Sequence, residues 1–292
     1  MRLLILFCSL LLISACAENT NNTPSEEPIP EFTLSCDLNV AYTPLADPIE
    51  SPSSNGTPAS ITVLVLHGKN GSPNNSGMND LRANLNAAGY NVVMPYLPWT
   101  GTNWNGTLCD GMAYINQIID AERAKSTNYI LLLGHSLGAT NALAYTALSD
   151  TSKPENLIAV APGHYLHESS ILSTVLAPSI SLAKNMVANG QSNDIATFQT
   201  YNNGQTVDIS TTPLIYLSFH DTAEFPDIKS SINEIETRIL WLAGQSDSLT
   251  NSAKNLGIID IVEKNKNITY KEVSGDHFTI LQNVPSELLD FF

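Results

Sequence analysis

Short apolar segments recur along the chain and alternate with segments that have helical spacing. The apolar segments are rich in Val, Ile and Leu and have the length of buried strands. These predicted strands cover residues 60–66, 90–95, 128–133, 156–161, 237–243 and 267–273. The predicted helices cover residues 76–88, 108–124, 137–148 and 284–291. Strands that are apolar throughout and alternate with helices indicate an α/β fold, with a mostly parallel central sheet and helices on both faces.

The alternation breaks between residues 163 and 237. The stretch ESSILSTVLAPSISLAKNMVA has helical spacing but contains Pro178, and polar sequence that we interpret as irregular follows it to about residue 213. We therefore predict a helical cap insertion at about residues 164–233, over the carboxyl edge of the sheet.

The first residues have a separate pattern. Arg2 precedes an almost wholly apolar run from Leu3 to Ile13, which has the length of a signal-peptide core and is too short to span a bilayer permanently. The run ends in Ile13-Ser14-Ala15-Cys16, which resembles a bacterial lipobox. The resemblance implies a signal peptide at residues 1–15 and lipid attachment to Cys16. An ordinary secretory signal peptide that contains a cysteine is the alternative.

Residues 17–31 are polar and contain Pro, so we predict a flexible tether over residues 16–32 and a folded domain over 33–292. Residue 17 is Ala rather than Asp, and by resemblance to lipoproteins of diderm bacteria this favours the outer membrane. The expected location is therefore the bacterial cell envelope, with the protein exported and lipid-anchored.

Two cysteines remain beyond Cys16 in the exported chain, Cys36 and Cys109. In an oxidising compartment this pair predicts a disulfide, and two buried free thiols are the alternative. The cysteine spacing suggests no zinc site.

The composition excludes some partners. The chain has 13 Lys+Arg against 28 Asp+Glu and a formal net charge of −15. Nucleic-acid binding requires basic side chains that replace counterions, so we expect no nucleic-acid partner. Adsorption to an anionic membrane by charge is likewise disfavoured, and the expected membrane attachment is the lipid on Cys16.

The strongest chemical motif is Gly134-His135-Ser136-Leu137-Gly138. It directly follows the predicted strand at 128–133 and directly precedes the predicted helix at 137–148. That context is required of a nucleophile elbow, in which Ser136 projects from a sharp strand-to-helix turn.

A serine hydroxyl needs a base, and the base needs a carboxylate to orient it. His277 follows the last predicted strand, and Asp247 follows the strand at 237–243. These two residues are our candidate base and acid. The rival acids are Asp221, Asp227, Asp260 and Asp276.

The order Ser136, Asp247, His277 resembles that of the α/β-hydrolase superfamily. Leu66-His67-Gly68-Lys69 is similar to the His-Gly element of that family. The resemblance implies an oxyanion hole formed by the backbone N–H groups of Lys69 and Leu137. A serine at the elbow favours acyl chemistry through an acyl-enzyme, with no metal or organic cofactor.

The substrate pocket is less well determined by the sequence. Trp99 and Trp104 follow a strand end, where they line the pocket or pack within their own loop. His164 and Tyr165 follow the strand at 156–161 as further candidates, with a structural role as the alternative for His164. The acidic chain and a cap poor in Lys and Arg favour a small or medium neutral ester.

The sequence thus predicts a serine hydrolase, most similar to carboxylesterases and lipases. Thioesterase, peptidase and acyltransferase activities with the same three residues are alternatives. A further alternative is a non-catalytic surface lipoprotein that uses the hydrolase scaffold for binding.

Overall fold

The computed structural model describes residues 35–54, 60–125, 129–202 and 204–291. The predicted signal peptide, Cys16 and the predicted tether lie outside the described residues. Within these ranges, no helix has the length and hydropathy that crossing a membrane requires.

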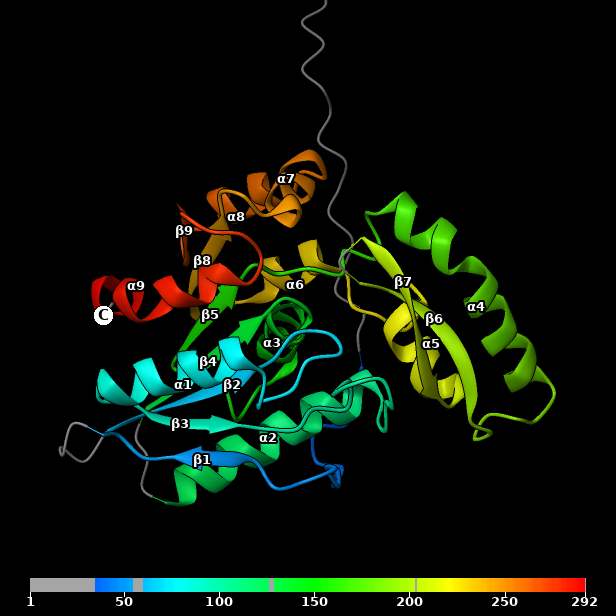
Figure 1. Cartoon of the computed structure of the whole chain (residues 1–292), viewed down its shortest axis with the longest axis horizontal. Helices are drawn as coiled ribbons and strands as arrows, with labels where there is room; N and C mark the ends of the chain where they lie inside the picture. The colour runs from blue at the N-terminus through cyan, green and yellow to red at the C-terminus, as the bar shows by residue number, and fades with distance from the viewer. Residues whose placement is uncertain (1–34, 55–59, 126–128, 203, 292) are drawn as a thin grey trace, which may run out of the picture.

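A seven-stranded sheet forms the centre of the molecule, in the order β1-β3-β2-β4-β5-β8-β9 (Figure 1). Neighbouring strands are parallel, except that β1 pairs antiparallel with β3 at one edge. All six predicted strands are present, whereas β1 was not predicted. The strands are β1 (Ile49–Ser51), β2 (Ile61–Leu66), β3 (Asn91–Met94), β4 (Tyr129–His135), β5 (Asn156–Val160), β8 (Arg238–Gly244) and β9 (Ile268–Val273).

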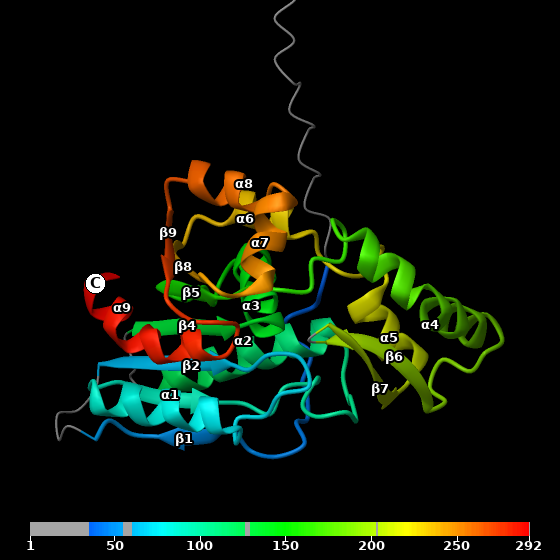
Figure 2. The ribbon, with the colours of Figure 1, turned by 45° about the horizontal axis from the view of Figure 1, so that its top comes forward.

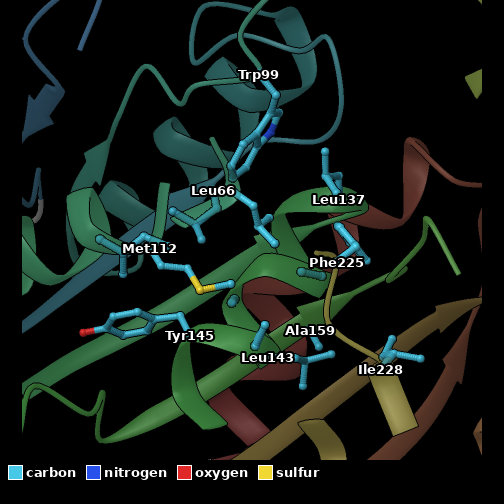
Figure 3. Close-up of a cluster of buried hydrophobic side chains, with 14 of the residues drawn as sticks. Leu66, Trp99, Met112, Leu137, Leu143, Tyr145, Ala159, Phe225 and Ile228 are labelled. Atoms are coloured by element: carbon cyan, nitrogen blue, oxygen red, sulfur yellow. The ribbon is translucent and has the colours of Figure 1, made fainter. Parts of the chain in front are cut away.

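Helices cover both faces of the sheet, as predicted. Side chains of α1, η1 and α9 pack against Val63 and Val65 of β2 in one apolar cluster. Side chains of α2, α3, α6 and α8 form the other cluster together with Leu64 and Leu66, and part of this cluster is drawn in Figure 3. The elements are α1 (Ser76–Ala87), α2 (Leu108–Ala124), α3 (Leu137–Leu148), α6 (Ile228–Glu234), α7 (Ser248–Asn255), α8 (Ile258–Lys264), η1 (Thr279–Asn283) and α9 (Val284–Phe291). Alternate residues of one strand face opposite layers, so both layers require apolar side chains.

The insertion between β5 and β8 forms a lobe beside the sheet, visible in Figure 1 and Figure 2. We call α4 (Ser170–Ala188), β6 (Ala196–Asn202), β7 (Gln205–Thr211) and α5 (Pro213–His220) the cap lobe. The prediction of irregular sequence up to residue 213 is wrong, because β6 and β7 form an antiparallel hairpin. The last helix of the insertion, α6, lies outside the cap lobe, because it packs on α3 and α8 in the helical layer of the sheet.

The predicted disulfide is present. It joins Cys36 to Cys109, across a sequence separation of 73 residues and a Cα–Cα distance of 5.3 Å. Cys109 lies in the first turn of α2, so the bond fixes the N-terminal part of the described chain to the sheet's helical layer.

Candidate active site

Ser136 lies on a sharp turn between β4 and α3. Its φ of 56° and ψ of −122° are sparsely populated by non-glycine residues. A Cβ on Gly134 would collide with the backbone of Gly138 and Ala139, and one on Gly138 would lie 2.5 Å from the Leu66 carbonyl oxygen. Glycine is therefore needed at both positions to let α3 approach β4 and β2, as the elbow motif predicted.

The three residues predicted from strand ends meet in one hydrogen-bonded chain. Nδ1 of His277 lies 2.8 Å from Oδ2 of Asp247, and a carboxylate only accepts, so Nδ1 carries the proton. Nε2 then accepts from the Ser136 hydroxyl, whose oxygen is 3.0 Å away. This is the arrangement that a serine nucleophile, a general base and an orienting acid require.

Among the candidate acids, Asp247 is the one whose carboxylate lies beside His277, because its own turn directs it there. It is 2% exposed and caps α7, with Oδ1 accepting from the Leu249 N–H at 2.9 Å and Oδ2 left for His277. The rival acids lie in other roles: Asp221 pairs with Lys184, Asp227 caps α6, Asp260 belongs to α8, and Asp276 binds Thr279.

His135 supports this chain although the sequence analysis assigned it no role. Its Nε2 lies 2.7 Å from the carbonyl oxygen of His277, to which it donates. Burial lowers the pKa of His135 to about 3, so the ring is neutral and keeps one N–H. The loop of His277 is thus held from the elbow itself, a contact between distant segments with no signal in the sequence.

We call residues His67–Gly71, which follow β2, the oxyanion loop. Lys69 is in this loop and Leu137 is the first residue of α3, and both line a cavity together with Ser136. The Lys69 N–H has no hydrogen-bond partner among the described residues, and the Leu137 N–H precedes the helical ladder. Both groups are therefore available to a ligand beside Ser136.

The prediction that Trp99 and Trp104 line the substrate pocket is wrong, and their contacts extend beyond their own loop, which was the predicted alternative, to the oxyanion loop and Phe219. Both are buried, and neither contributes to the cavities at Ser136. Trp99 Nε1 donates to the His67 carbonyl oxygen at 3.0 Å, and Trp104 Nε1 donates to Oδ1 of Asn70 at 3.0 Å. The two indole N–H groups therefore fix the position of the oxyanion loop.

His67 has a structural role in the same loop. Its ring lies between the Gly68 carbonyl oxygen (2.9 Å from Nδ1) and Oγ1 of Thr100 (2.9 Å from Nε2). Burial lowers its pKa to about 4, so the neutral ring acts as a fixed bridge within the protein.

Two cavities meet at Ser136 and His277. The α1-side cavity, of about 630 Å³, extends over α1 and η1, with residues such as Asn75, Asn84 and Gln282 in its lining. The cap-side cavity, of about 440 Å³, extends under the cap and is lined in part by Leu137, Leu172, Leu249 and Leu256.

His164 and Tyr165, the other two predicted pocket residues, line the cap-side cavity, and both are largely buried. Nε2 of His164 donates to the Phe219 carbonyl oxygen at 2.6 Å, and the Tyr165 hydroxyl donates to that of Pro162. His164 therefore also has the structural role left open by the sequence. In the described part of the chain, no group of three or more His, Cys, Asp or Glu could hold a metal ion.

Solved structures with this fold come from several organisms. A monoacylglycerol lipase from Paleococcus ferrophilus is 19% identical with a TM-score of 0.59, covering 85% of this chain and 100% of its own. MenH from S. aureus is 17% identical with a TM-score of 0.60, over 85% and 98%. Est1E from Butyrivibrio proteoclasticus, solved with ferulic acid, is 14% identical with a TM-score of 0.56, over 84% and 94%. At these identities the likeness establishes the α/β-hydrolase fold.

Among curated proteins no relative matches the chain. One family model does match, over residues 98–275, which is more than half of the 292 residues. The match contains Ser136 and Asp247 and ends two residues before His277. Fold and family model agree: the chain belongs to the hydrolase family Hydrolase_4, described as serine aminopeptidase, S33.

Proposed function

We propose that this protein is a serine hydrolase that cleaves carboxylic esters through an acyl-enzyme. The observation that carries the proposal is the continuous hydrogen-bonded chain from Ser136 through His277 to Asp247 on a strained elbow. Folding does not require a hydrogen-bonded chain with this geometry. Acyl transfer, in contrast, requires all three groups in this order.

In the proposed reaction, His277 takes the Ser136 proton while Oγ attacks the ester carbonyl carbon. The N–H groups of Lys69 and Leu137 stabilise the negative oxygen of the tetrahedral intermediate. His277 then gives its proton to the departing alcohol, leaving the acyl group on Ser136. A water molecule, deprotonated by His277, releases the carboxylic acid and restores the serine.

The two cavities that meet at Ser136 suit the two parts of an ester, the acyl group and the alcohol. Leucines line part of the cap-side cavity, which suits an apolar acyl group. Carboxamide side chains contribute to the α1-side cavity, which suits a polar alcohol. We therefore propose a neutral ester of small or medium size, and the neighbours that are a monoacylglycerol lipase and a ferulic-acid complex support an ester substrate.

The decisive experiment is labelling by a fluorophosphonate, followed by hydrolysis of p-nitrophenyl esters of increasing acyl length. We expect the label on Ser136 and turnover of the shorter esters, with both absent in Ser136→Ala. A folded wild-type protein that neither takes the label nor hydrolyses any ester would favour the non-catalytic binding alternative.

Aminopeptidase activity is a second candidate, favoured by Glu168. This residue lines the cap-side cavity, and neither carboxylate oxygen has a hydrogen-bond partner in another described residue. A substrate with a free amino group would supply the missing donor. Amino-acid p-nitroanilides and thioesters belong in the same panel, and preference for an anilide that is lost in Glu168→Gln would favour the peptidase.

We also propose export and lipid anchoring through Cys16. The lipobox-like sequence and the Cys36–Cys109 disulfide, which suits an oxidising compartment, support this location. Incorporation of a labelled fatty acid into the full chain, absent in Cys16→Ser, tests the anchor. Fractionation of the envelope tests the predicted outer-membrane location.

A further inference from the structure

Lys69 has an unusual side-chain environment for the residue whose backbone N–H is the proposed oxyanion-hole donor. Its ammonium lies 2.7 Å from Nδ1 of His164, 3.1 Å from the carbonyl oxygen of Tyr201 and 3.3 Å from Oγ1 of Thr200. None of these partners is a carboxylate, and no ion pair of Lys69 is found among the described residues.

The proton positions on the two histidines follow from their other partners. Nε2 of His164 faces the Phe219 carbonyl oxygen, so it is the donor and Nδ1 is the acceptor for Lys69. Nδ1 of His220 donates to the Tyr216 carbonyl oxygen at 3.0 Å, so its Nε2, 2.8 Å from Oγ1 of Thr200, accepts from that hydroxyl.

This ordering leaves Oγ1 of Thr200 as an acceptor for Lys69. The three N–H bonds of the ammonium therefore meet three neutral acceptors. Burial lowers the pKa of Lys69 to about 7, which reflects how incompletely neutral groups compensate a buried charge. An apolar side chain of similar length would fill this place at less electrostatic cost, so stability alone does not explain the lysine.

The partners all belong to the insertion, whereas Lys69 belongs to the oxyanion loop. Thr200 and Tyr201 are in β6, His220 ends α5, and His164 lies between β5 and the cap lobe at a φ of 65°. The Lys69 side chain thus binds two parts of the insertion directly, His164 and β6, and it reaches α5 through the hydrogen bond between Thr200 and His220.

We propose that Lys69 is a positioning residue: its ammonium couples the seated position of the cap lobe to the placement of its own backbone N–H in the oxyanion hole. With the cap seated, the three contacts fix the loop. With the cap displaced, the loop loses them and the N–H departs from the place where negative charge develops. This inference rests on the proposed serine-hydrolase function.

The test compares Lys69→Met with wild type on a short p-nitrophenyl ester. Methionine is unbranched like lysine and one heavy atom shorter, and it keeps the backbone N–H but removes every side-chain donor. Loss of one oxyanion-hole donor costs about 10²–10³-fold in kcat. A displaced donor should cost roughly ten- to thirtyfold, with KM within about threefold, because the oxyanion forms only in the transition state.

A trifluoromethyl ketone supplies a readout that a merely structural role would not move. It forms a hemiketal with Ser136 whose oxygen occupies the oxyanion hole. We expect its inhibition constant to rise in Lys69→Met by the same factor by which kcat/KM falls. Lys69→Arg, which keeps charge and donors, should recover part of both losses. Unchanged kcat, or a change confined to KM, would overturn the inference.

A matched pair in β6 covers the case in which Lys69→Met does not fold. Thr200→Val removes an oxygen that contacts Lys69, whereas Thr197→Val makes the same change at an exposed position of the same strand. We expect about a fivefold lower kcat for Thr200→Val and no change for Thr197→Val, and equal values would overturn the inference. Wild type without labelling or turnover would instead refute the proposed function.

Discussion

The carboxyl edge of the sheet and the cap lobe bury polar groups in different ways. At the edge, two groups are fixed by the turns that carry them, Ser136 by its positive φ and Asp247 by its place at the start of α7, whereas the loop of His277 is also held from a distant segment, by His135. In the cap lobe, Thr200 and His220 are fully buried and are held by partners distant in the sequence.

This difference separates two kinds of specification. The edge is defined by local geometry that survives as long as the sheet folds. The cap is defined by long-range polar contacts, which no longer stabilise the fold when one partner moves away. Substitutions at the edge should therefore lower kcat by large factors, and substitutions in the cap lobe should lower it by smaller factors. The following experiments test that order.

The largest effects are expected at the edge. Ser136→Ala and His277→Ala should lower kcat by about 10⁴–10⁶-fold, because either change removes the nucleophile or its base. Asp247→Asn should cost less, about 10³–10⁴-fold, because the base is misoriented rather than absent. Esterase assays on protein with unchanged circular dichroism measure these factors. Losses under tenfold for Ser136→Ala would assign the turnover to another group.

The elbow glycines should come next. Gly138→Ala places a methyl group against the Leu66 backbone, so we expect loss of stability by more than about 3 kcal/mol together with activity. Gly190→Ala in the cap lobe is the matched control: its φ is 77° but no atom lies within 4 Å of the added Cβ. It should cost about 1 kcal/mol in urea unfolding and leave kcat unchanged.

The same contrast explains what the sequence could predict. Continuous apolar strands separated by helices determined the sheet, and strand ends carrying Ser136, Asp247 and His277 determined the candidate site. These features are local, so one sequence is enough. β1 was missed because it is three residues long and pairs at an edge, where no apolar pattern is required.

The cap was harder to predict because its buried face is partly polar. Phe198 and Thr200 point inward from β6, and a threonine gives no hydrophobic signal. The dipeptide Asn203-Gly204 between two alternating runs was the available sign of a hairpin. The roles of Trp99 and Trp104 depend on contacts with residues about 30 positions earlier, which no spacing rule supplies.

Acid should weaken both regions through their buried histidines. Burial lowers the pKa of His67 to about 4 and that of His164 and His220 well below 6.5. Unfolded histidine binds a proton below pH 6.5, whereas these folded rings do not, so stability is complete above that pH and falls as pH drops.

His67 alone should contribute about 3 kcal/mol of this loss by pH 4. Urea unfolding between pH 7 and pH 4 measures the slope. His220→Gln in the cap lobe should flatten it, because glutamine does not titrate. A slope that is unchanged in this variant would show that the cap histidine is not buried in neutral form.

The smallest effect is expected at Trp104, which lies in contact with both the cap lobe and the oxyanion loop. Trp104→Phe keeps an aromatic ring beside Phe219 but removes the N–H that binds Asn70 of the oxyanion loop. We expect a stability loss of about 1 kcal/mol and a Tm lower by about 2–4 °C. Because Asn70 neighbours Lys69, kcat should also fall by roughly two- to fivefold.

Tyr216→Phe is the matched control for Trp104→Phe, because it also removes one side-chain hydrogen-bond donor of an aromatic residue, but inside the cap lobe. Its hydroxyl donates to the Gln199 carbonyl oxygen at 2.7 Å, and among the described residues it makes no hydrogen bond to the oxyanion loop. The Tm should fall by a similar amount while kcat stays at the wild-type value. If both variants lower kcat equally, then general loosening of the cap, rather than its contact with the oxyanion loop, limits turnover, and the division between edge and cap fails.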